Sequence, residues 1–129
     1  MVAKDIMTKE IITVGPTTSV KKLAMTLVKN QISGAPVVDK NGKIIGVVSE
    51  ADIVGKKGKD VKAIMSKKVI SVTEDAPVEA VARLMITHKI TRLPVMRDDE
   101  VIGIVSRADI VNLIAMGKHV ALHTVASDA

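Results

Sequence analysis

Two short stretches of the chain combine a serine with an aspartate three residues later, Ser49-x-x-Asp52 and Ser106-x-x-Asp109. Each follows a glycine-containing apolar run and opens a segment with helical character. A serine before a helix accepts a hydrogen bond from a free backbone amide, and a carboxylate three residues on lies favourably at the positive helix end. The pattern predicts a variant of the capping box, worth about 1 kcal/mol to each helix.

The same geometry supports a second interpretation, in which the motif binds a ligand. A turn from a strand into a helix presents free amides and a hydroxyl group to an anion. A carboxylate in that place can accept hydrogen bonds from both hydroxyls of a ribose, as acidic residues do in dinucleotide sites. Because helix caps of this kind are common, the motif alone favours capping, and only its context can favour binding.

The elements that position these motifs occur twice. Residues 4–54 reappear as residues 62–111, with an offset of 58 that falls to 57 after a turn, and the last stretches, IIGVVSEADIV and VIGIVSRADIV, match closely. A repeat of this length is too long for one helical-repeat unit and too short for two ordinary independent domains. We predict two half-domains packed with pseudo-twofold symmetry, at residues 1–57 and 58–129, the second with a C-terminal helical tail.

Each repeat is predicted to contain a strand, a helix, two strands and a second helix. Apolar residues at positions i, i+3, i+4, i+7 and i+8 predict amphipathic helices over 18–30 and 76–88. Short β-rich runs at 11–14 and 69–72 precede these helices, and each helix is followed by a hairpin that begins at a proline. The predicted fold class is α/β (α+β), with a small three-stranded sheet and two helices in each repeat.

Composition limits the classes of function. The 129-residue chain has no Cys, which removes disulfides, a thiol nucleophile and cysteine-based zinc sites. No segment approaches the roughly 20 apolar residues that a membrane span needs. The first residues carry charges where a signal peptide would be apolar. We therefore expect a cytoplasmic protein with no membrane association.

The net charge of +5 has two interpretations, a solvated lysine-rich surface or an attraction to anions such as nucleic acid or phosphorylated small molecules. Base stacking on single strands normally uses aromatic side chains, and the sequence has no Phe, Tyr or Trp. Binding to a duplex backbone needs no aromatic residue and stays open.

Catalysis is not predicted. The glycines form no nucleotide-binding fingerprint, and His88, which the pattern places in a helix, has no spacing that argues for a Ser-His-acid arrangement. His119 and His123 could share a helical face, but they lack the glutamate of a zinc-protease motif, and two ligands make no structural zinc site. We expect no enzyme, no metal and no required cofactor.

The ordered context of the two Ser-x-x-Asp motifs resembles the CBS domain family (cystathionine β-synthase domain), whose members occur as tandem pairs. Over about residues 4–113, each repeat has an opening Ile-Met-Thr/Ser, an amphipathic helix, an Ile-x-x-x-Pro-Val element and a Gly-hydrophobic-Val-Ser-x-x-Asp element. The non-helical elements are Ile6-Met7-Thr8, Ile32 to Val37 and Gly46 to Asp52 in the first repeat, and Ile64-Met65-Ser66, Ile90 to Val95 and Gly103 to Asp109 in the second.

The resemblance implies two clefts between the repeats that bind an adenosine compound: AMP, ADP, ATP, or S-adenosylmethionine and its relatives. It implies that Asp52 and Asp109 hold the ribose diol. Arg92 would reach a phosphate, whereas the first repeat has Gly34 there, so the clefts are expected to differ in phosphate affinity. Ser49 and Ser106 would reach ribose or phosphate, and the adenine would be lined or read by Thr8, Ile12, Ile32, Ser33, Ser66, Ile70, Ile90 and Thr91.

Three functions remain open at this stage: a regulatory module that binds an adenosine nucleotide and acts on another protein, a basic nucleic-acid-associated protein, and an interaction scaffold with vestigial clefts. A homodimer through helices is also expected, because apolar positions on the second helices have little of their own chain to cover them. These positions are Ile53, Val54, Ile110, Leu113, Ile114, Met116 and Val120.

Overall fold

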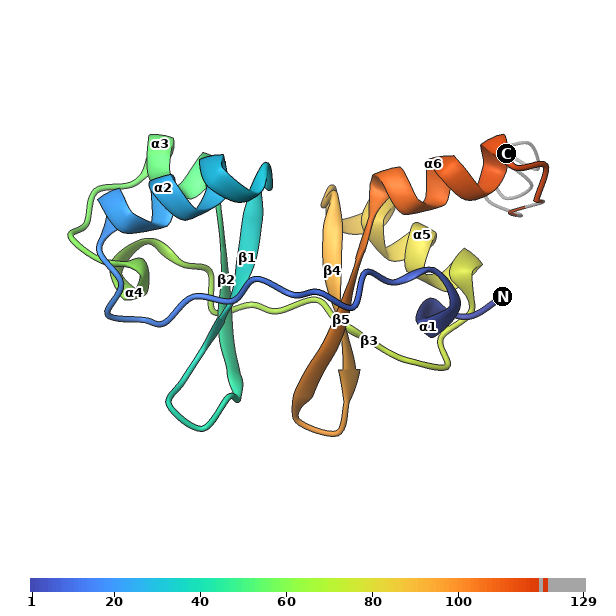
Figure 1. Ribbon diagram of the computed structural model, residues 1–129, viewed down its shortest axis with the longest axis horizontal. Helices are drawn as coiled ribbons and strands as arrows, with labels where there is room; N and C mark the ends of the chain where they lie inside the picture. Colours follow the sequence, from blue (N-terminus) through green and yellow to red (C-terminus); the bar gives the residue numbers. More distant parts are fainter. Residues whose placement is uncertain (119, 121–129) are drawn as a thin grey trace. The chain divides into compact units, whose positions relative to one another are not determined.

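The computed structural model describes residues 1–118 and 120, and the chain divides into two compact units. The first-repeat unit comprises residues 12–69, and the second-repeat unit combines residues 1–11 with the chain from residue 70 onward. The predicted boundary after residue 57 follows the sequence repeat, whereas the compact units exchange their opening segments. In Figure 1 the dark-blue N-terminal helix lies among yellow and orange elements, and the green helix α4 (Val61–Ile64) lies with the light-blue ones.

The first-repeat unit is built on a β-hairpin. Strands β1 and β2 pair antiparallel, and Val14 adds one parallel bridge to Val37. Within residues 12–69, all of which the structure describes, the sheet has two strands, so the predicted third strand is reduced to this bridge. Pro16 follows closely and has no amide hydrogen to continue a ladder. The elements are α2 (Val20–Asn30), β1 (Gly34–Val38), β2 (Ile44–Ser49), α3 (Glu50–Gly55) and α4 (Val61–Ile64).

Helix α2 confirms the predicted amphipathic helix, with one correction. The Ser19 hydroxyl accepts a hydrogen bond from the Lys22 amide (3.1 Å) at its start. The helix stops where Gln31 takes a left-handed conformation (φ 54°). Leu23 and Leu27 are buried against the hairpin, each worth roughly 1.5–3 kcal/mol. Val28, which the apolar period over residues 18–30 places on the same stripe, is exposed instead.

The second-repeat unit has a three-stranded sheet, as the pattern predicts, in the order β3-β4-β5. Its first strand is shorter and later than the predicted run at 69–72, because β3 comprises only Val72–Thr73. β3 runs parallel to β4, and β4 runs antiparallel to β5. Helix α5 buries Val78, Val81, Ala82 and Met85, whereas Ile86 is exposed. The elements are α1 (Ala3–Ile6), β3 (Val72–Thr73), α5 (Val78–His88), β4 (Arg92–Arg97), β5 (Glu100–Ser106) and α6 (Arg107–Ala115).

Helix α6 corrects the expected dimer surface. Ile110 and Leu113 are three residues apart, so they share one helix face, and each is only 5% exposed in the core of its own unit. The apolar residues that α6 leaves exposed are Val111 and Ile114. Of the other predicted positions, Val54 and Met116 are exposed, Val120 is buried, and Ile53 is partly buried against the first-repeat core.

Helix α6 covers only the beginning of the predicted C-terminal helical tail. It stops at Ala115, and Gly117 adopts a left-handed conformation (φ 82°) that favours glycine. Within the described residues, the predicted helical tail therefore ends at Ala115. His119 and His123 lie outside the described residues. Over residues 1–118 and 120, no helix combines the length and the apolar character needed to cross a membrane.

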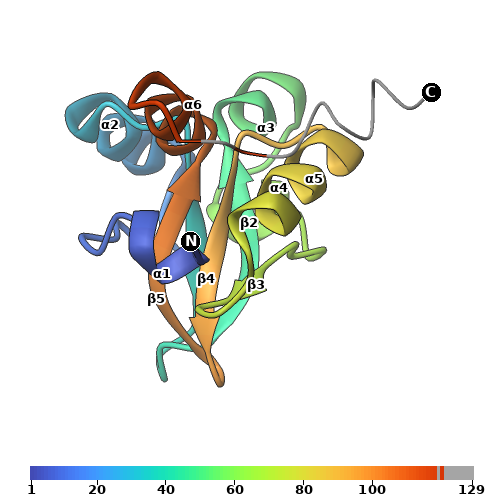
Figure 2. The ribbon, with the colours of Figure 1, turned by 90° about the vertical axis from the view of Figure 1, so that its right-hand side faces the viewer.

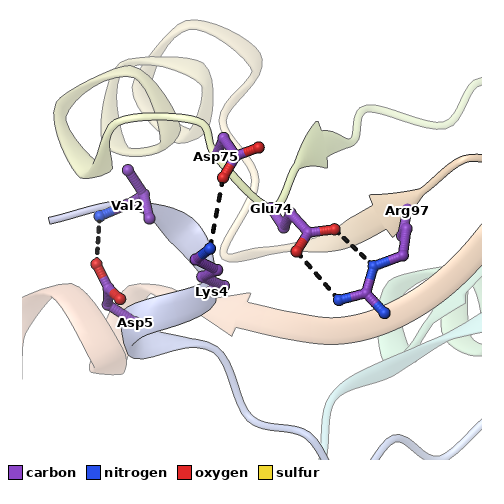
Figure 3. Close-up of polar contacts among 6 residues, drawn as sticks. All are labelled: Val2, Lys4, Asp5, Glu74, Asp75 and Arg97. Atoms are coloured by element: carbon purple, nitrogen blue, oxygen red, sulfur yellow. Dashed lines mark hydrogen bonds and ion pairs between the residues drawn. The ribbon is translucent and has the colours of Figure 1, made fainter.

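The N-terminal helix α1 docks on the second-repeat unit, as Figure 2 shows. The Ala3 amide donates to the Ala76 carbonyl (2.8 Å), and the Lys4 amide donates to the Glu74 carbonyl (3.0 Å). Polar side chains surround this contact (Figure 3): the Arg97 guanidinium binds both carboxylate oxygens of Glu74, at 2.7 and 3.0 Å. These bonds thus hold together three segments that are far apart in the chain, at residues 3–4, 74–76 and 97.

We expect the Glu74–Arg97 pair to contribute to acid sensitivity. The hydrogen bond from Arg97 lowers the pKa of Glu74 below its ordinary value of 4.5. A lowered folded-state pKa stabilises the fold above the ordinary value, and this stabilisation is lost as the pH falls through the folded-state pKa. Glu74→Gln should therefore flatten the loss of thermal stability below about pH 4.5. Asp75→Asn, which changes a longer and exposed contact with Lys4 (3.7 Å), is the control, and equal effects would contradict the assignment.

Candidate functional site

Asp52 closes a capping box at the start of α3. Its Oδ2 atom accepts a hydrogen bond from the Ser49 amide (2.9 Å) and another from the Ser49 hydroxyl (3.3 Å). Its Oδ1 atom forms an ion pair with the Lys56 ammonium at 2.9 Å. The Asp52 side chain is only 15% exposed. The predicted capping role is confirmed here, and both carboxylate oxygens have partners.

Asp109 makes the same cap at the start of α6. Its Oδ2 atom accepts from the Ser106 amide (2.8 Å) and from the Ser106 hydroxyl (3.1 Å). The Ser106 oxygen also accepts from the Asp109 amide at 3.3 Å. Capping therefore uses one carboxylate oxygen, Oδ2, in both repeats, and the binding interpretation depends on what the other oxygen can do.

The proline-led strands lie directly beside these caps. The Ser33 carbonyl accepts a hydrogen bond from the Glu50 amide (2.8 Å), and Gly34 pairs with Ser49 across the hairpin. This contact holds the backbone that the resemblance assigns to base recognition next to the Ser-x-x-Asp turn of the same repeat.

The second repeat has the same arrangement. The Thr91 carbonyl accepts from the Arg107 amide (2.7 Å), and Arg92 pairs with Ser106. The half-buried Ile90, which precedes this strand, packs on the core of its unit. A guanidinium-bearing residue thus begins the strand beside the Asp109 turn, whereas Gly34 begins the strand beside the Asp52 turn.

The opening segments cross to the other repeat's strand. Ser66 exchanges two backbone hydrogen bonds with Val47, both 2.9 Å, and Thr8 exchanges two with Ile104, at 2.8 and 3.0 Å. Val47 lies in β2 and Ile104 lies in β5, and each of these strands leads into the Ser-x-x-Asp turn of its own repeat. Ser66 of the second repeat is therefore in the unit of Asp52, and Thr8 of the first repeat is in the unit of Asp109, an exchange that sequence reasoning missed.

Glycines in the Gly-hydrophobic-Val-Ser element make this crossing possible. A Cβ atom on Gly46 would lie 2.8 Å from both the Met65 sulfur and the Ser66 carbonyl oxygen. A Cβ atom on Gly103 would collide with the side chain of Met7. The methionine of each opening Ile-Met-Thr/Ser thus lies over the glycine of the other repeat. Both motifs recur in each repeat, but recurrence alone does not indicate which segments are in contact.

The predicted binding residues divide between the two compact units, and each set takes the name of its aspartate. Six of these side chains are half-buried: Ile12, Ile32, Ile70, Ile90, Asp52 and Asp109. No group of three or more metal-ligating side chains occurs among the described residues. The Asp52 cluster, in the first-repeat unit, consists of Ile12, Ile32, Ser33, Ser49, Asp52 and Ser66. The Asp109 cluster, in the second-repeat unit, consists of Thr8, Ile70, Ile90, Thr91, Arg92, Ser106 and Asp109.

Known proteins similar to this chain include enzymes and isolated domain pairs. L-aspartate semialdehyde sulfurtransferase of Methanocaldococcus jannaschii is 37% identical over 114 residues, which cover 85% of this chain and 22% of that protein. This chain therefore spans about a fifth of the length of that curated relative.

Two solved structures match nearly the whole chain. The CBS domain pair of protein MJ0100, in complex with 5′-methylthioadenosine and S-adenosyl-L-methionine, has a TM-score of 0.86 at 35% identity and covers 92% of this chain and 98% of its own. CBSX2 in complex with AMP has a TM-score of 0.84 at 31% identity with the same coverage. A further solved structure is that of CBSX2 from Arabidopsis thaliana. The sequence model of the CBS domain family matches residues 3–58 and 61–116. The chain therefore belongs to the CBS domain family, as a tandem pair.

Proposed function

We propose that the chain is a non-catalytic regulatory module that senses an adenosine-containing ligand of the AMP, ADP, ATP or S-adenosylmethionine type. The observation that carries the proposal is the half-buried aspartate of each unit, held by its own serine beside a proline-led strand. Relatives with this fold were crystallised with AMP and with S-adenosyl-L-methionine and 5′-methylthioadenosine, which supports the same class of ligand here.

The proposed roles follow from the groups in the Asp109 cluster. Asp109 accepts the ribose hydroxyls, and the Ser106 hydroxyl reaches the ribose or a phosphate. The Arg92 guanidinium pairs with phosphate, a charge-assisted and often bidentate contact. Backbone at Thr91 reads the base, and Ile90 contacts its face. Since the sequence has no aromatic residue to stack on adenine, we expect micromolar affinity.

A thermal-shift panel tests this function. AMP, ADP, ATP, NAD and S-adenosylmethionine are each added to the protein, and a ligand that binds only the folded state raises its Tm with concentration. We expect at least one adenosine compound to raise the Tm. A flat response to all five would favour the scaffold with vestigial clefts.

Arg92→Ala is expected to weaken AMP binding by roughly tenfold, the scale of one charge-assisted hydrogen bond, and to leave adenosine binding nearly unchanged. The reason is that adenosine carries no phosphate for the guanidinium to hold. Calorimetric titration of both ligands measures the difference. Arg97→Ala, which removes a guanidinium of the same unit, serves as the control, and equal losses of AMP and adenosine in Arg92→Ala would exclude a phosphate role.

We further propose that the module is a homodimer through its helices. Both units expose apolar residues at equivalent helical positions, Val28 and Ile86 on the first helices and Val54 and Val111 on the second. A twofold partner covers exposed apolar positions economically because one surface serves both subunits. The regulated protein would be a separate partner.

Val54→Glu is expected to dissociate the dimer, because Val54 is 88% exposed and a buried unpaired charge at the interface is costly. Light scattering after chromatography at micromolar concentration gives the mass. Lys57→Glu is the control, because it adds negative charge nearby without replacing an apolar residue. A monomeric mass for the unmodified protein would end the dimer proposal. Leu113 is unsuitable for this test, since it lies in the core and a charge there would unfold the chain.

A second candidate function, binding to a polyanion such as duplex nucleic acid, is supported by the distribution of charge. The first-repeat unit has eleven lysines and four acidic residues, a net charge of +7, whereas the second-repeat unit has eight basic and ten acidic residues, a net charge of −2. A phosphate-backbone binder would lose affinity steeply as salt rises. Fluorescence anisotropy with a labelled duplex at 50 and 200 mM salt would detect it.

A further inference from the structure

The Asp52 and Asp109 clusters differ at the carboxylate oxygen that capping leaves unused. The Lys56 ammonium lies 2.9 Å from Oδ1 of Asp52 and also donates to the Ile64 carbonyl at 3.1 Å. The corresponding position in the second repeat is Leu113, an apolar core residue. Among the described residues, Asp109 forms no ion pair. The two aspartates are therefore equivalent as caps and different as acceptors.

This difference bears on ribose binding. A ribose diol donates two hydrogen bonds, and in both clusters Oδ2 already accepts from an amide and a hydroxyl. A diol must therefore draw on Oδ1. At Asp52 it would compete there with an ammonium that the Ile64 carbonyl also holds. The Asp52 side chain is 15% exposed and the Lys56 side chain 48%, so the pair is partly shielded from water and harder to displace than a fully exposed one.

We propose that Lys56 closes the Asp52 cluster to a ribose diol, so that the Asp109 cluster is the principal nucleotide site. This inference rests on the proposed function, adenosine-ligand binding through the two aspartates. The residue at the start of the proline-led strand acts in the same direction. Arg92 carries a guanidinium at the start of the strand beside the Asp109 turn, whereas Gly34 has no side chain beside the Asp52 turn.

The test isolates the Asp52 cluster in an Asp109→Asn background. Lys56→Met keeps an unbranched side chain and removes the ammonium, so Oδ1 of Asp52 is released. Calorimetric titration with AMP compares Asp109→Asn with the double variant Lys56→Met/Asp109→Asn. We expect the double variant to bind AMP at least roughly tenfold more tightly, the scale of one charge-assisted hydrogen bond.

Two controls separate release of the carboxylate from a general charge effect. Lys57→Met/Asp109→Asn loses the same charge at the next residue, which is exposed, and should bind AMP like Asp109→Asn alone. 2′-Deoxy-AMP lacks one hydroxyl of the diol and should not show the gain. Thermal unfolding without ligand verifies that each variant is folded.

Equal AMP affinities for Asp109→Asn and the double variant overturn the inference, including the case in which neither binds. A similar gain for the Lys57 variant, or for 2′-deoxy-AMP, overturns it as well. Failure of the proposed function has a different signature, since the unmodified protein would then bind none of the adenosine compounds. Two equal AMP sites in the unmodified protein would sink the inference and leave the proposed function standing.

Discussion

Replacing Asp109 with asparagine is expected to weaken AMP binding by about ten- to a hundredfold, the scale of hydrogen bonds to a charged group. The asparagine side-chain oxygen can still accept from the Ser106 amide and hydroxyl, which now bind Oδ2 of Asp109. Its amide nitrogen cannot accept a hydrogen bond from a ribose hydroxyl. The variant therefore keeps most of the cap and loses the acceptor for the diol.

Calorimetry with AMP measures this effect, and thermal unfolding without ligand shows that the cap persists. Asp99→Asn, in the turn between β4 and β5, removes a carboxylate from the same unit at an exposed position and should leave AMP affinity unchanged. Asp52→Asn should have a smaller effect than Asp109→Asn if Lys56 already occupies that carboxylate. If Asp109→Asn bound AMP as the unmodified protein does, the carboxylate would be a cap only.

Gly46→Ala is expected to destabilise the fold by about 1–3 kcal/mol, the usual cost of overpacking a well-packed position. The added methyl group would lie 2.8 Å from the Ser66 carbonyl oxygen and from the Met65 sulfur. The sulfur can move with its flexible side chain. The carbonyl cannot move easily, because the Ser66 backbone is fixed by two hydrogen bonds to Val47. Urea unfolding, analysed as a two-state transition, gives the loss.

Gly103→Ala is the matched variant in the second repeat and is expected to cost less. There, the two nearest atoms are the sulfur and Cγ of Met7, which another rotamer moves away, and only the Met7 Cβ at 3.1 Å stays in place. The difference between the two variants measures the rigidity of the crossing backbone. Equal losses, or a neutral Gly46→Ala, would mean that the opening segment yields in both units and that the contact is not a specific one.

The two interpretations of the Ser-x-x-Asp motif are compatible in this fold. The capping bonds use Oδ2 of each aspartate, and they hold the carboxylate at a strand-to-helix turn beside the proline-led strand. A cap of this kind fixes the orientation of the side chain before any ligand arrives. Pre-organisation lowers the entropic cost of binding, which matters for a site without large aromatic anchors.

The elements that depend on local interactions could be predicted from the sequence. Helices α2 and α5 follow from a 3.6-residue apolar period, and the caps at Ser49 and Ser106 follow from residues three positions apart. The repeat pattern indicated the family and therefore the fold, because four elements in the same order recur in both halves. The candidate residues around each aspartate were found by the same route.

The partners of these elements were decided by tertiary structure. Thr8 pairs with Ile104 and Ser66 with Val47, contacts between distant segments that a periodic pattern does not encode. The burial of Leu113 likewise depends on where the sheet lies beneath α6. The ion pair of Lys56 with Asp52 is a local contact. The second repeat has the buried Leu113 at the position of Lys56, so only the structure shows that the two aspartates differ in their partners. Sequence period and capping chemistry thus determined the two similar halves, while long-range packing decided which segments complete each half and how the two aspartates differ.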